Sequence, residues 1–307
     1  MRSIEEKRCS MCGKRATYMQ VSSGTRFCRG CFIQWIEAKV RRTIAKYGML
    51  DPDDKIAIAI SGGKDSLALS SILSRIEEGY PRSELVGITI DEGIGGYRVE
   101  AVEIASEFCR KIGIEFTTRS FKELYGYDLD EIVRAKGDEL SPCSYCGVLR
   151  RKALNVLARE MGADKLATAH TLDDVVQTFL LNVVHGNVDR ISRVSPTTTI
   201  DHPKFVRRIK PLFETPEREL SLYAHLKSIP FQSSVCPYAT LSLRGDIRSL
   251  MNRLDTRHPG IKFNLFRSFL RIQEGLPRQT GIIGSCRLCG EPSTNELCNS
   301  CSLLSRK

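Results

Sequence analysis

The chain has 307 residues and a formal net charge of +10, and its length suits one large or two modest domains. No apolar run approaches the roughly 20 residues that span a bilayer, and the amino terminus lacks the apolar core of a signal peptide. We therefore expect a cytoplasmic protein with no membrane partner. The positive charge favours a polyanionic partner such as nucleic acid, although a basic enzyme of another kind would share it.

Twelve cysteines are many for a cytoplasmic chain, and ten of them form five CxxC pairs. In a reducing compartment such pairs are typical of metal sites rather than of disulfides. The first two pairs are separated by fifteen residues, a spacing at which each pair provides half of a tetrahedron of thiolates around zinc. We predict a zinc finger over 1–34 with the ligands Cys9, Cys12, Cys28 and Cys31.

A linker helix is expected over 35–54, and strand-like and helix-like segments then alternate along the chain. This alternation predicts an α/β domain over 55–240, in which a parallel, doubly wound sheet carries helices on both faces. Ligands of such sheets bind beyond the carboxyl ends of the strands. The expected strands are 55–60, 85–90, 114–118 and 165–169, and the expected helices are 66–79, 98–112, 148–161 and 172–185.

The first strand of this domain ends in the sequence SGGKDS, and a helix follows directly. The two glycines allow a tight turn that presents backbone N–H groups, and the helix adds the positive end of its dipole, so the turn is suited to bind phosphate. Its spacing is not that of a Walker A loop. The residues of the turn are Ser61, Gly62, Gly63, Lys64, Asp65 and Ser66.

SGGKDS after a buried strand resembles the PP-loop of the ATP pyrophosphatases. These enzymes cleave ATP between its α and β phosphates and leave AMP on an oxygen of the substrate. The resemblance implies that the serines and glycines of the turn hold the released diphosphate and that Lys64 adds positive charge. It also implies that Asp65 either orients phosphate or holds Mg²⁺.

The stretch ATAHTLDDVVQTFLLN is similar to the second signature of this family, a TGHNxDD pattern after a strand. Ala169 replaces the glycine and Thr171 the asparagine, whereas His170, Asp173 and Asp174 match the pattern. The resemblance places the Ala169 peptide and His170 in the ATP pocket. Asp174 either caps the following helix or, with ATP present, holds metal or orients the α-phosphate.

Three cysteines remain once the terminal pairs and Cys109 are set aside, because Cys109 lies on the apolar face of a predicted helix as an inert thiol. Cys143, Cys146 and Cys236 could hold an iron–sulfur cluster with one iron left open, or could take part in a persulfide route. A third zinc site is the structural alternative. Its fourth ligand would be His170, His185 or His225.

Two segments follow the α/β domain. Residues 241–280 contain a basic, helix-like stretch, and the last two cysteine pairs come after it, separated by eight residues. This spacing is typical of a compact zinc ribbon, which we predict over 281–307, so that the chain would bind two Zn²⁺ ions in all. The ligands of the ribbon are Cys286, Cys289, Cys298 and Cys301.

Two terminal zinc sites, a PP-loop, a central CxxC pair and a later single cysteine together resemble the tRNA 2-thiolation enzymes of the TtcA/TtuA type. The stretches IDEGIGGYR, YGYDLDEIV and CSYCGVLRRKALN are closer to one branch, that of the archaeal NcsA and the eukaryotic cytosolic thiouridylase subunit. The resemblance implies ATP-dependent adenylation of uridine O2 followed by sulfur transfer. The modified nucleotide is at wobble position 34 in this branch and at position 54 in the sister branch.

The same resemblance implies that the three central cysteines ligate a [4Fe–4S] cluster and that, with Asp65 and Asp174, they form the catalytic set. Arg150 falls where relatives have a basic nucleotide contact. The implied partners are tRNA, a second copy of the chain in a homodimer, and a sulfur donor. That donor could be inorganic sulfide, a ubiquitin-like thiocarboxylate carrier or a persulfide.

A tRNA substrate requires a basic surface, because contacts to phosphates provide affinity without sequence specificity. We expect residues 241–280 to form a helical tRNA-binding extension, and Tyr125 or Tyr145 to stack on an extruded base. The basic residues expected on this surface are Arg41, Arg42, Lys46, Arg207, Arg208, Lys210, Arg244, Arg248 and Arg253.

Two other functions are compatible with parts of the sequence. A PP-loop tRNA-modifying ligase without sulfur chemistry would share the SGGKDS turn, but it would leave the three central cysteines without a role. A non-catalytic zinc-finger RNA-binding module would share the terminal sites, but it would not need an intact PP-loop.

Overall fold

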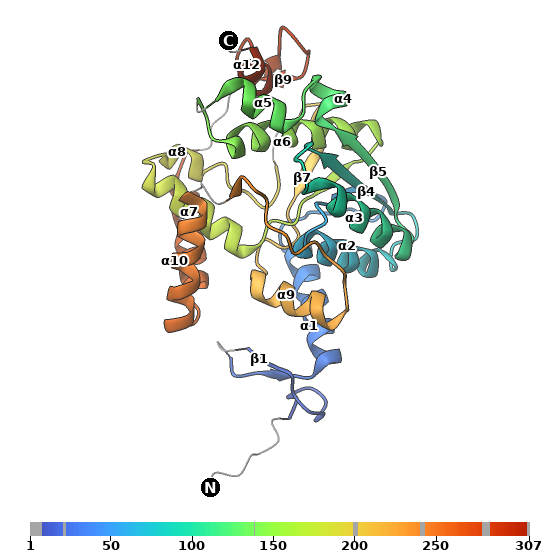
Figure 1. The fold of residues 1–307 in the computed structure, drawn as a ribbon. Helices are drawn as coiled ribbons and strands as arrows, with labels where there is room; N and C mark the ends of the chain where they lie inside the picture. The colour runs from blue at the N-terminus through green and yellow to red at the C-terminus, as the bar shows by residue number, and fades with distance from the viewer. Residues whose placement is uncertain are drawn as a thin grey trace.

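The computed structural model describes residues 8–20, 23–137, 139–198, 202–239, 243–277 and 283–305. A parallel five-stranded sheet lies at its centre, with the strand order β5-β4-β3-β6-β7 (Figure 1). The chain starts in the middle of the sheet and adds strands first on one side and then on the other, which is a doubly wound order. The strands are β3 (Lys55–Ala59), β4 (Glu84–Asp91), β5 (Glu115–Ser120), β6 (Lys165–Ala167) and β7 (Arg207–Ile209).

Helices cover both faces of this sheet, so the predicted α/β fold class is confirmed. Ile56 and Ile58 of β3 face a core formed with α1, α2, α3 and α9, whereas Ala57 between them faces α4, α5, α6 and α12. Alternate residues of a pleated strand point to opposite faces, which explains why β3 is apolar from Ile56 to Ala59. The helices are α1 (Arg29–Lys46), α2 (Lys64–Glu77), α3 (Arg98–Lys111), α4 (Phe121–Tyr125), α5 (Leu129–Lys136), α6 (Pro142–Glu160), α9 (Glu217–Leu226) and α12 (Asn299–Ser305).

A third apolar cluster joins α7 (Leu172–Val184) to α10 (Leu243–Arg257) and α11 (Ile261–Gly275). The ring centroids of Phe179 on α7 and Phe269 on α11 are 5.8 Å apart. The helical extension expected over 241–280 therefore packs against the α/β domain, although 241, 242 and 278–280 lie outside the described residues. The short helix α8 (Val188–Ile191) follows α7.

Helices α4, α5, α8 and α9 were not among the expected elements, and three further elements differ from the sequence-based expectation. Helix α6 begins at Pro142 rather than near 148, because proline suits the first turn of a helix, where no N–H partner is needed. Strand β7 was not predicted, since its three residues include two arginines and carry no strand signal. Helix α1 begins at Arg29, inside the range predicted for the first zinc finger.

Two small antiparallel strand pairs flank the sheet: β1 (Tyr18–Met19) with β2 (Arg26–Phe27), and β8 (Gly284–Ser285) with β9 (Pro292–Ser293). Near each pair, four cysteine sulfurs lie within 4.8 Å of one another, a compact arrangement that fits one tetrahedral ion. Residues 1–7, 21, 22, 281, 282, 306 and 307 of the predicted zinc modules lie outside the described residues. The two sets are Cys9, Cys12, Cys28 and Cys31, and Cys286, Cys289, Cys298 and Cys301.

Both cysteine sets are attached to the body of the protein. The Arg29 guanidinium donates to the Leu226 carbonyl at 2.6 Å, which holds the first set near α9. At the other end, Lys152 Nζ lies 3.2 Å from Cys289 Sγ, and Arg159 pairs with Glu291 at 2.7 Å. Four thiolates around a divalent ion leave net negative charge, which Lys152 offsets. Within the described ranges, no helix has both the length and the apolar character to cross a membrane.

We predict that Cys301→Ser removes one of about two zinc ions per chain, because one ligand of a closed four-thiolate site is lost. Metal binding provides much of the folding free energy of such small modules, so the apparent melting temperature should also fall. Zinc analysis after dialysis and thermal unfolding measure the two effects. Cys109→Ala is the control, because it removes a buried thiol of α3 outside both sets. Equal zinc contents in the two variants would contradict the assignment.

Candidate active site

The predicted glycine turn connects β3 to α2 and is held by its own side chains. The Ser66 hydroxyl accepts from the Ser61 N–H at 3.1 Å and donates to the Gly63 carbonyl at 2.9 Å. Gly62 has φ of +82°, and a Cβ at this position would lie 2.4 Å from the Ala101 carbonyl oxygen. Only glycine fits both constraints. The turn is therefore formed before any ligand binds, with the N-terminus of α2 directed at its mouth.

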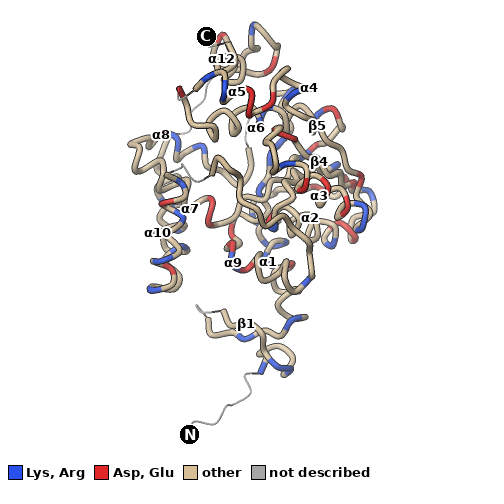
Figure 2. Tube along the Cα trace, in the orientation of Figure 1, with Lys and Arg blue, Asp and Glu red and all other residues tan. Residues whose placement is uncertain are grey.

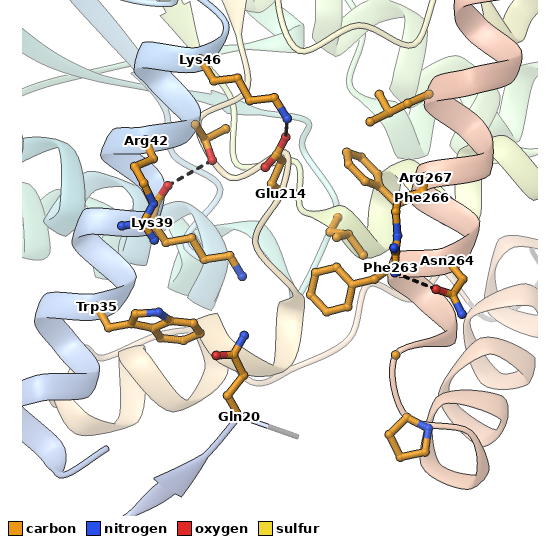
Figure 3. A pocket seen from close by; sticks show the side chains of 15 residues that line it. Gln20, Trp35, Lys39, Arg42, Lys46, Glu214, Phe263, Asn264, Phe266 and Arg267 are labelled. Carbon is orange, nitrogen blue, oxygen red and sulfur yellow. Dashed lines mark hydrogen bonds and ion pairs between the residues drawn. The ribbon is translucent and has the colours of Figure 1, made fainter. Parts of the chain in front are cut away.

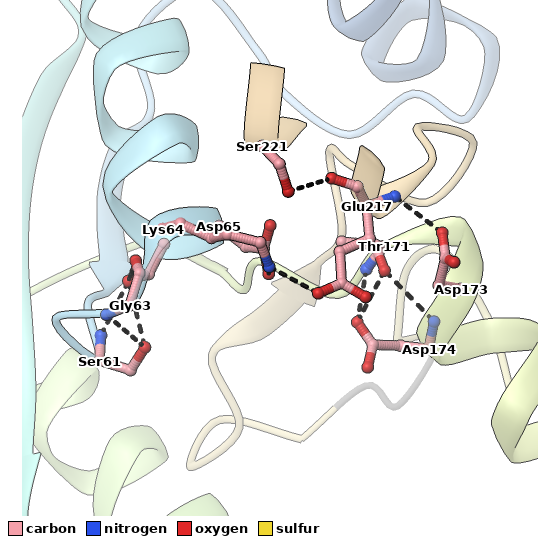
Figure 4. A network of polar contacts seen from close by, with 10 residues as sticks. Ser61, Gly63, Lys64, Asp65, Thr171, Asp173, Asp174, Glu217 and Ser221 are labelled. Atoms are coloured by element: carbon pink, nitrogen blue, oxygen red, sulfur yellow. Dashed lines mark hydrogen bonds and ion pairs between the residues drawn. The ribbon is translucent and has the colours of Figure 1, made fainter. Parts of the chain in front are cut away.

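Acidic side chains from three helices meet beside this turn (Figure 4). Lys64 Nζ pairs with Asp65 Oδ2 at 3.0 Å and with Glu217 Oε1 of α9 at 2.6 Å. The Glu217 N–H donates to Asp173 Oδ2 at 2.7 Å, which ties α9 to α7. Burial raises the pKa of Asp65 to about 6; Lys64 opposes this, and the charges of Glu217 and Asp174 add to it. Asp65 Oδ1 is buried without a hydrogen-bond partner among the described residues.

The second signature lies at the start of α7, opposite the turn. Thr171 is the N-cap residue, and Asp174 Oδ2 accepts from both the Thr171 N–H and its hydroxyl at 2.9 Å. Asp174 thus takes part in capping α7, as expected for a carboxylate at the start of a helix. These capping bonds use only one of its two carboxylate oxygens. Ala169 follows β6 and is half-buried, and His170 Nδ1 lies 2.9 Å from Thr168 Oγ1.

The three central cysteines converge. Cys143 and Cys146 are three residues apart on the first turns of α6, so they share one helical face. Cys143 Sγ lies 3.6 Å from the carbonyl of Tyr238, two residues after the half-buried Cys236. Burial and the charge of Cys236 raise the pKa of Cys143, and burial raises that of Cys146 to about 11. Metal binding at these thiols must therefore displace their protons.

Two connections join the thiols to the glycine turn. The first is the segment that contains Cys236: the Gln232 N–H donates to the Gly62 carbonyl at 3.0 Å, and its side-chain amide donates to the Tyr97 carbonyl at 2.6 Å. Four residues after Gln232, the chain reaches Cys236 beside Cys143. The segment therefore spans directly from the phosphate-binding turn to the thiols.

The second connection is a chain of ion pairs. The Arg98 guanidinium donates to the Ser61 carbonyl at 3.0 Å and pairs with Glu92 at 2.6 Å. Glu92 also pairs with Arg150 at 3.2 Å, four residues after Cys146 on α6. Arg98 and Glu92 are buried, whereas the Arg150 side chain is 48% exposed. The backbone of the turn and the helix of the CxxC pair thus share one buried charge network.

Glu92 and Arg98 lie six residues apart within the IDEGIGGYR stretch, but the sequence gave no sign that their side chains pair. It did not indicate Glu217 either, because the partners of Glu217, Lys64 and Asp173, are distant in the chain. The expectation that Tyr145 stacks on a base is wrong, because its side chain is 1% exposed. Tyr125 is half-buried, and its hydroxyl donates to the Leu149 carbonyl at 2.8 Å.

A separate cavity of about 840 Å³ lies between α1 and α11 (Figure 3). Trp35 and Phe263 face it together with Lys39, Arg42 and Lys46. Two of these cations are paired: Lys39 lies 2.7 Å from Glu219, and Lys46 lies 2.6 Å from Glu214. Arg42 and Arg267, which also line the cavity, form no ion pair among the described residues, so the charge of the cavity is only partly compensated within the protein.

No third zinc site is assembled in the part of the chain that the structure describes. Only the two terminal sets bring three or more cysteine, histidine or carboxylate ligand atoms within 4.8 Å of one another there. The sulfurs of the three central cysteines do not all lie within this distance of one another. Such a spacing fits a polynuclear cluster better than it fits one zinc ion.

A family model for the PP-loop domain matches residues 34–254. A probable sulfurtransferase of Methanocaldococcus jannaschii is 38% identical over 96% of this chain and 86% of that protein. The tRNA 2-thiolation protein NcsA of Haloferax volcanii is 34% identical over 96% of this chain and 98% of that protein. The structure of the U34-tRNA thiolase NcsA from Methanococcus maripaludis with its [4Fe–4S] cluster superposes with a TM-score of 0.86 at 38% identity, covering 98% of this chain and 96% of that chain.

The sheet, the glycine turn and the family match define an ATP-binding protein of the PP-loop class. Within this class, the chain belongs to the family of NcsA-type tRNA 2-thiolation enzymes. The resemblance drawn from the sequence is confirmed.

We predict that Gly62→Ala destabilises the protein and that Gly63→Ala does not. The first replacement forces an L-residue into the left-handed region, at about 1–2 kcal/mol, and adds a clash with the Ala101 backbone. At Gly63 the nearest atom to a new Cβ is Ser61 Oγ at 3.5 Å, an ordinary contact. Thermal unfolding of the two ligand-free variants checks the difference. Equal melting temperatures would show that the turn is not held in the conformation described.

Proposed function

We propose that this protein is an ATP-dependent tRNA-uridine 2-sulfurtransferase that acts at wobble position 34 in the cytoplasm. The observation that carries the proposal is the connection between a phosphate-binding turn and three converging cysteines, through Gln232 and through the Arg98–Glu92 pair. The relative named a U34-tRNA thiolase supports position 34 over position 54, and relatives of Drosophila named cytoplasmic tRNA 2-thiolation protein 1 support the location.

The glycine turn is suited to hold the diphosphate of ATP. The N–H groups of Gly63 and the following residues, with the hydroxyls of Ser61 and Ser66, would bind its oxygens, and Lys64 would offset their charge. Asp65 Oδ1 is buried without a partner among the described residues, so it fits a cation such as Mg²⁺. Asp174 would act on the other side of the same ion or on the α-phosphate, through the oxygen that does not cap α7.

The first chemical step activates the uridine. Its C2 carbonyl is a poor electrophile, and oxide is a poor leaving group. Uridine O2 attacks the α-phosphorus, the bond to the bridging oxygen of the β-phosphate breaks, and pyrophosphate leaves with that electron pair. Charge on the transferred phosphate is stabilised by positioned cations and N–H groups, which the turn and Lys64 provide.

The second step replaces oxygen by sulfur. Cys143, Cys146 and Cys236 would hold a [4Fe–4S] cluster as thiolates, and Cys143 is the exposed member of the three. Such a cluster would supply the sulfide. Sulfide adds to C2, and AMP then leaves with the former O2. Arg150, half-exposed and four residues from Cys146, would offset the charge of the departing phosphate.

The two rival functions account for less of the structure. A PP-loop ligase without sulfur chemistry gives no reason for three thiols to converge at the end of the Gln232–Tyr238 segment. A non-catalytic RNA-binding module gives no reason for the buried, unpartnered Asp65 oxygen. Both rivals would also leave unused the connection between the turn and the thiols.

The remaining parts of the proposal concern partners. Lys and Arg positions recur along α10, in the expected tRNA-binding extension, and two Zn²⁺ ions would order the terminal modules (Figure 2). We propose tRNA as the substrate and a homodimer as the working form. Inorganic sulfide or a ubiquitin-like thiocarboxylate carrier would renew the sulfur.

Nucleoside mass spectrometry of tRNA from a deletion strain tests the function. We expect 2-thiouridine to be lost at position 34, and to be restored by the wild-type gene and by Cys109→Ala, because Cys109 is buried and apart from the site. Cys143→Ala should restore none, because one of three ligands is missing. Unchanged 2-thiouridine at position 34 would overturn the proposal. Full restoration by Cys143→Ala would remove the role given to the central thiols.

A further inference from the structure

Five cations lie near one another although they come from three elements that are far apart in the sequence. Arg150 and Arg151 come from α6, Arg208 from β7 with Lys210 just after it, and Arg244 from α10. Loss of hydration lowers the pKa of His170, and the charges of Lys210, Arg208, Arg150 and Arg244 lower it further.

The strand geometry explains why Arg208 and Lys210 lie together. Residues two apart in a strand point to the same face, so both side chains lie on the face that carries α6. Between them, Ile209 is buried in the opposite core, and the side chain of Arg207 donates to the Gly48 carbonyl at 3.1 Å. Of the three basic residues expected here on the tRNA surface, Arg208 and Lys210 therefore lie on the α6 face of the sheet, and Arg207 lies on the opposite face.

Most of these five cations lack a counter-charge in the part of the chain that the structure describes. Among the described residues, Arg151, Arg208 and Lys210 take part in no ion pair, and Arg208 Nε is buried without a hydrogen-bond partner. Burial and neighbouring positive charge lower the pKa of Arg208, and lower that of Lys210 to about 7 even though Asp174 opposes the shift. Arg208 and Lys210 are half-buried, and a cation that is partly removed from water without a partner destabilises the folded state.

Within the described ranges, other cations with little exposure form ion pairs, so the absence of a partner for Arg208 and Lys210 is unusual. Lys165 lies 2.9 Å from Asp54 and 3.0 Å from Asp51, and Lys262 lies 2.5 Å from Asp173. An uncompensated cluster at the site of reaction is expected where an anionic ligand completes the charge balance.

We propose that Arg208 and Lys210, with Arg151, form a phosphate site that binds the tRNA backbone next to the nucleotide being modified. This inference rests on the proposed function, since it takes tRNA as the substrate. The three cations lie on the α6 side of the sheet, as the CxxC pair does, so a phosphate held there would place the adjoining base toward the thiols. Arg208 and Lys210 are positioning residues, because they would orient the base without touching C2.

The phosphates of ATP are a less suitable occupant. The glycine turn at the end of β3 already offers N–H groups, hydroxyls and Lys64 to the diphosphate. Strand β7 is two strands away from β3, which is about 10 Å across the sheet. Arg244, which also acts on His170, belongs to the basic helix α10 and extends the same charge toward the expected tRNA-binding surface.

Binding and stability measurements on the full chain test the site. An unmodified tRNA transcript and ATP are titrated separately against Arg208→Met and against Arg207→Met, which removes the same charge from the opposite face. We expect Arg208→Met to weaken tRNA binding about tenfold or more and to lower the slope of log Kd against log salt by about one. ATP binding should be unchanged. The melting temperature of the free protein should be equal or higher, because an uncompensated charge is gone.

Lys210→Met provides a second variant in case Arg208→Met folds poorly, and Arg208→Lys should recover part of the tRNA affinity. The proposed phosphate site is contradicted if Arg208→Met and Lys210→Met bind tRNA as Arg207→Met does, or if they lose affinity for ATP instead. A lower melting temperature with unchanged tRNA affinity would assign these residues a purely structural role and also overturns it. Failure of the wild-type protein to bind and thiolate tRNA would overturn the proposed function itself, and so is distinguishable.

Discussion

The structure depends on a buried ion pair between Arg98 and Glu92. Removing two charges from water is unfavourable unless the pair and its remaining hydrogen-bonding groups are satisfied. Here Arg98 also donates to the carbonyls of Ser61 and Ile90, and Glu92 also pairs with Arg150. Because Arg98 contacts the backbone of the phosphate-binding turn and Glu92 contacts both Arg98 and Arg150, the pair connects this turn to the helix that carries the CxxC pair.

The fold brings the rest of the site to the same place. The carboxyl ends of parallel strands meet at one edge of the sheet, so the turn after β3 and the His170 region after β6 become neighbours. The Gln232–Tyr238 segment then crosses from the turn to the thiols. Charge is arranged by the same elements: acidic groups collect beside the turn, and unpaired cations collect on the α6 side. The acidic groups and the unpaired cations therefore lie on different sides of the site. Such a separation is expected where acidic groups bind a metal cation and basic groups bind phosphates.

The local features of this site were predictable from the sequence, and the long-range ones were not. The SGGKDS turn and the two terminal cysteine sets are each formed by residues close in the chain, so their spacing carries the information. Cys236 could be joined to Cys143 and Cys146 by setting the other cysteines aside, and only the resemblance to a family turned this set into ligands of one cluster. Arg98 and Glu92 lie within a quoted stretch, but the sequence did not reveal their pairing, and Glu217 gave no signal because its partners are distant in the chain. Strand β7 was missed because its pairing with β6 outweighs a sequence without strand character.

The central claim is that bound ATP and the three central cysteines share one site. Electron paramagnetic resonance of the anaerobically reconstituted protein tests it directly, with Mn²⁺ in place of Mg²⁺ on ATP and with the cluster in its reduced, paramagnetic state. Spin coupling falls steeply with distance, so the account predicts that Mn²⁺–ATP broadens the cluster signal and speeds its relaxation, whereas Mg²⁺–ATP does neither. A cluster signal that stays the same when Mn²⁺–ATP is bound would contradict the account.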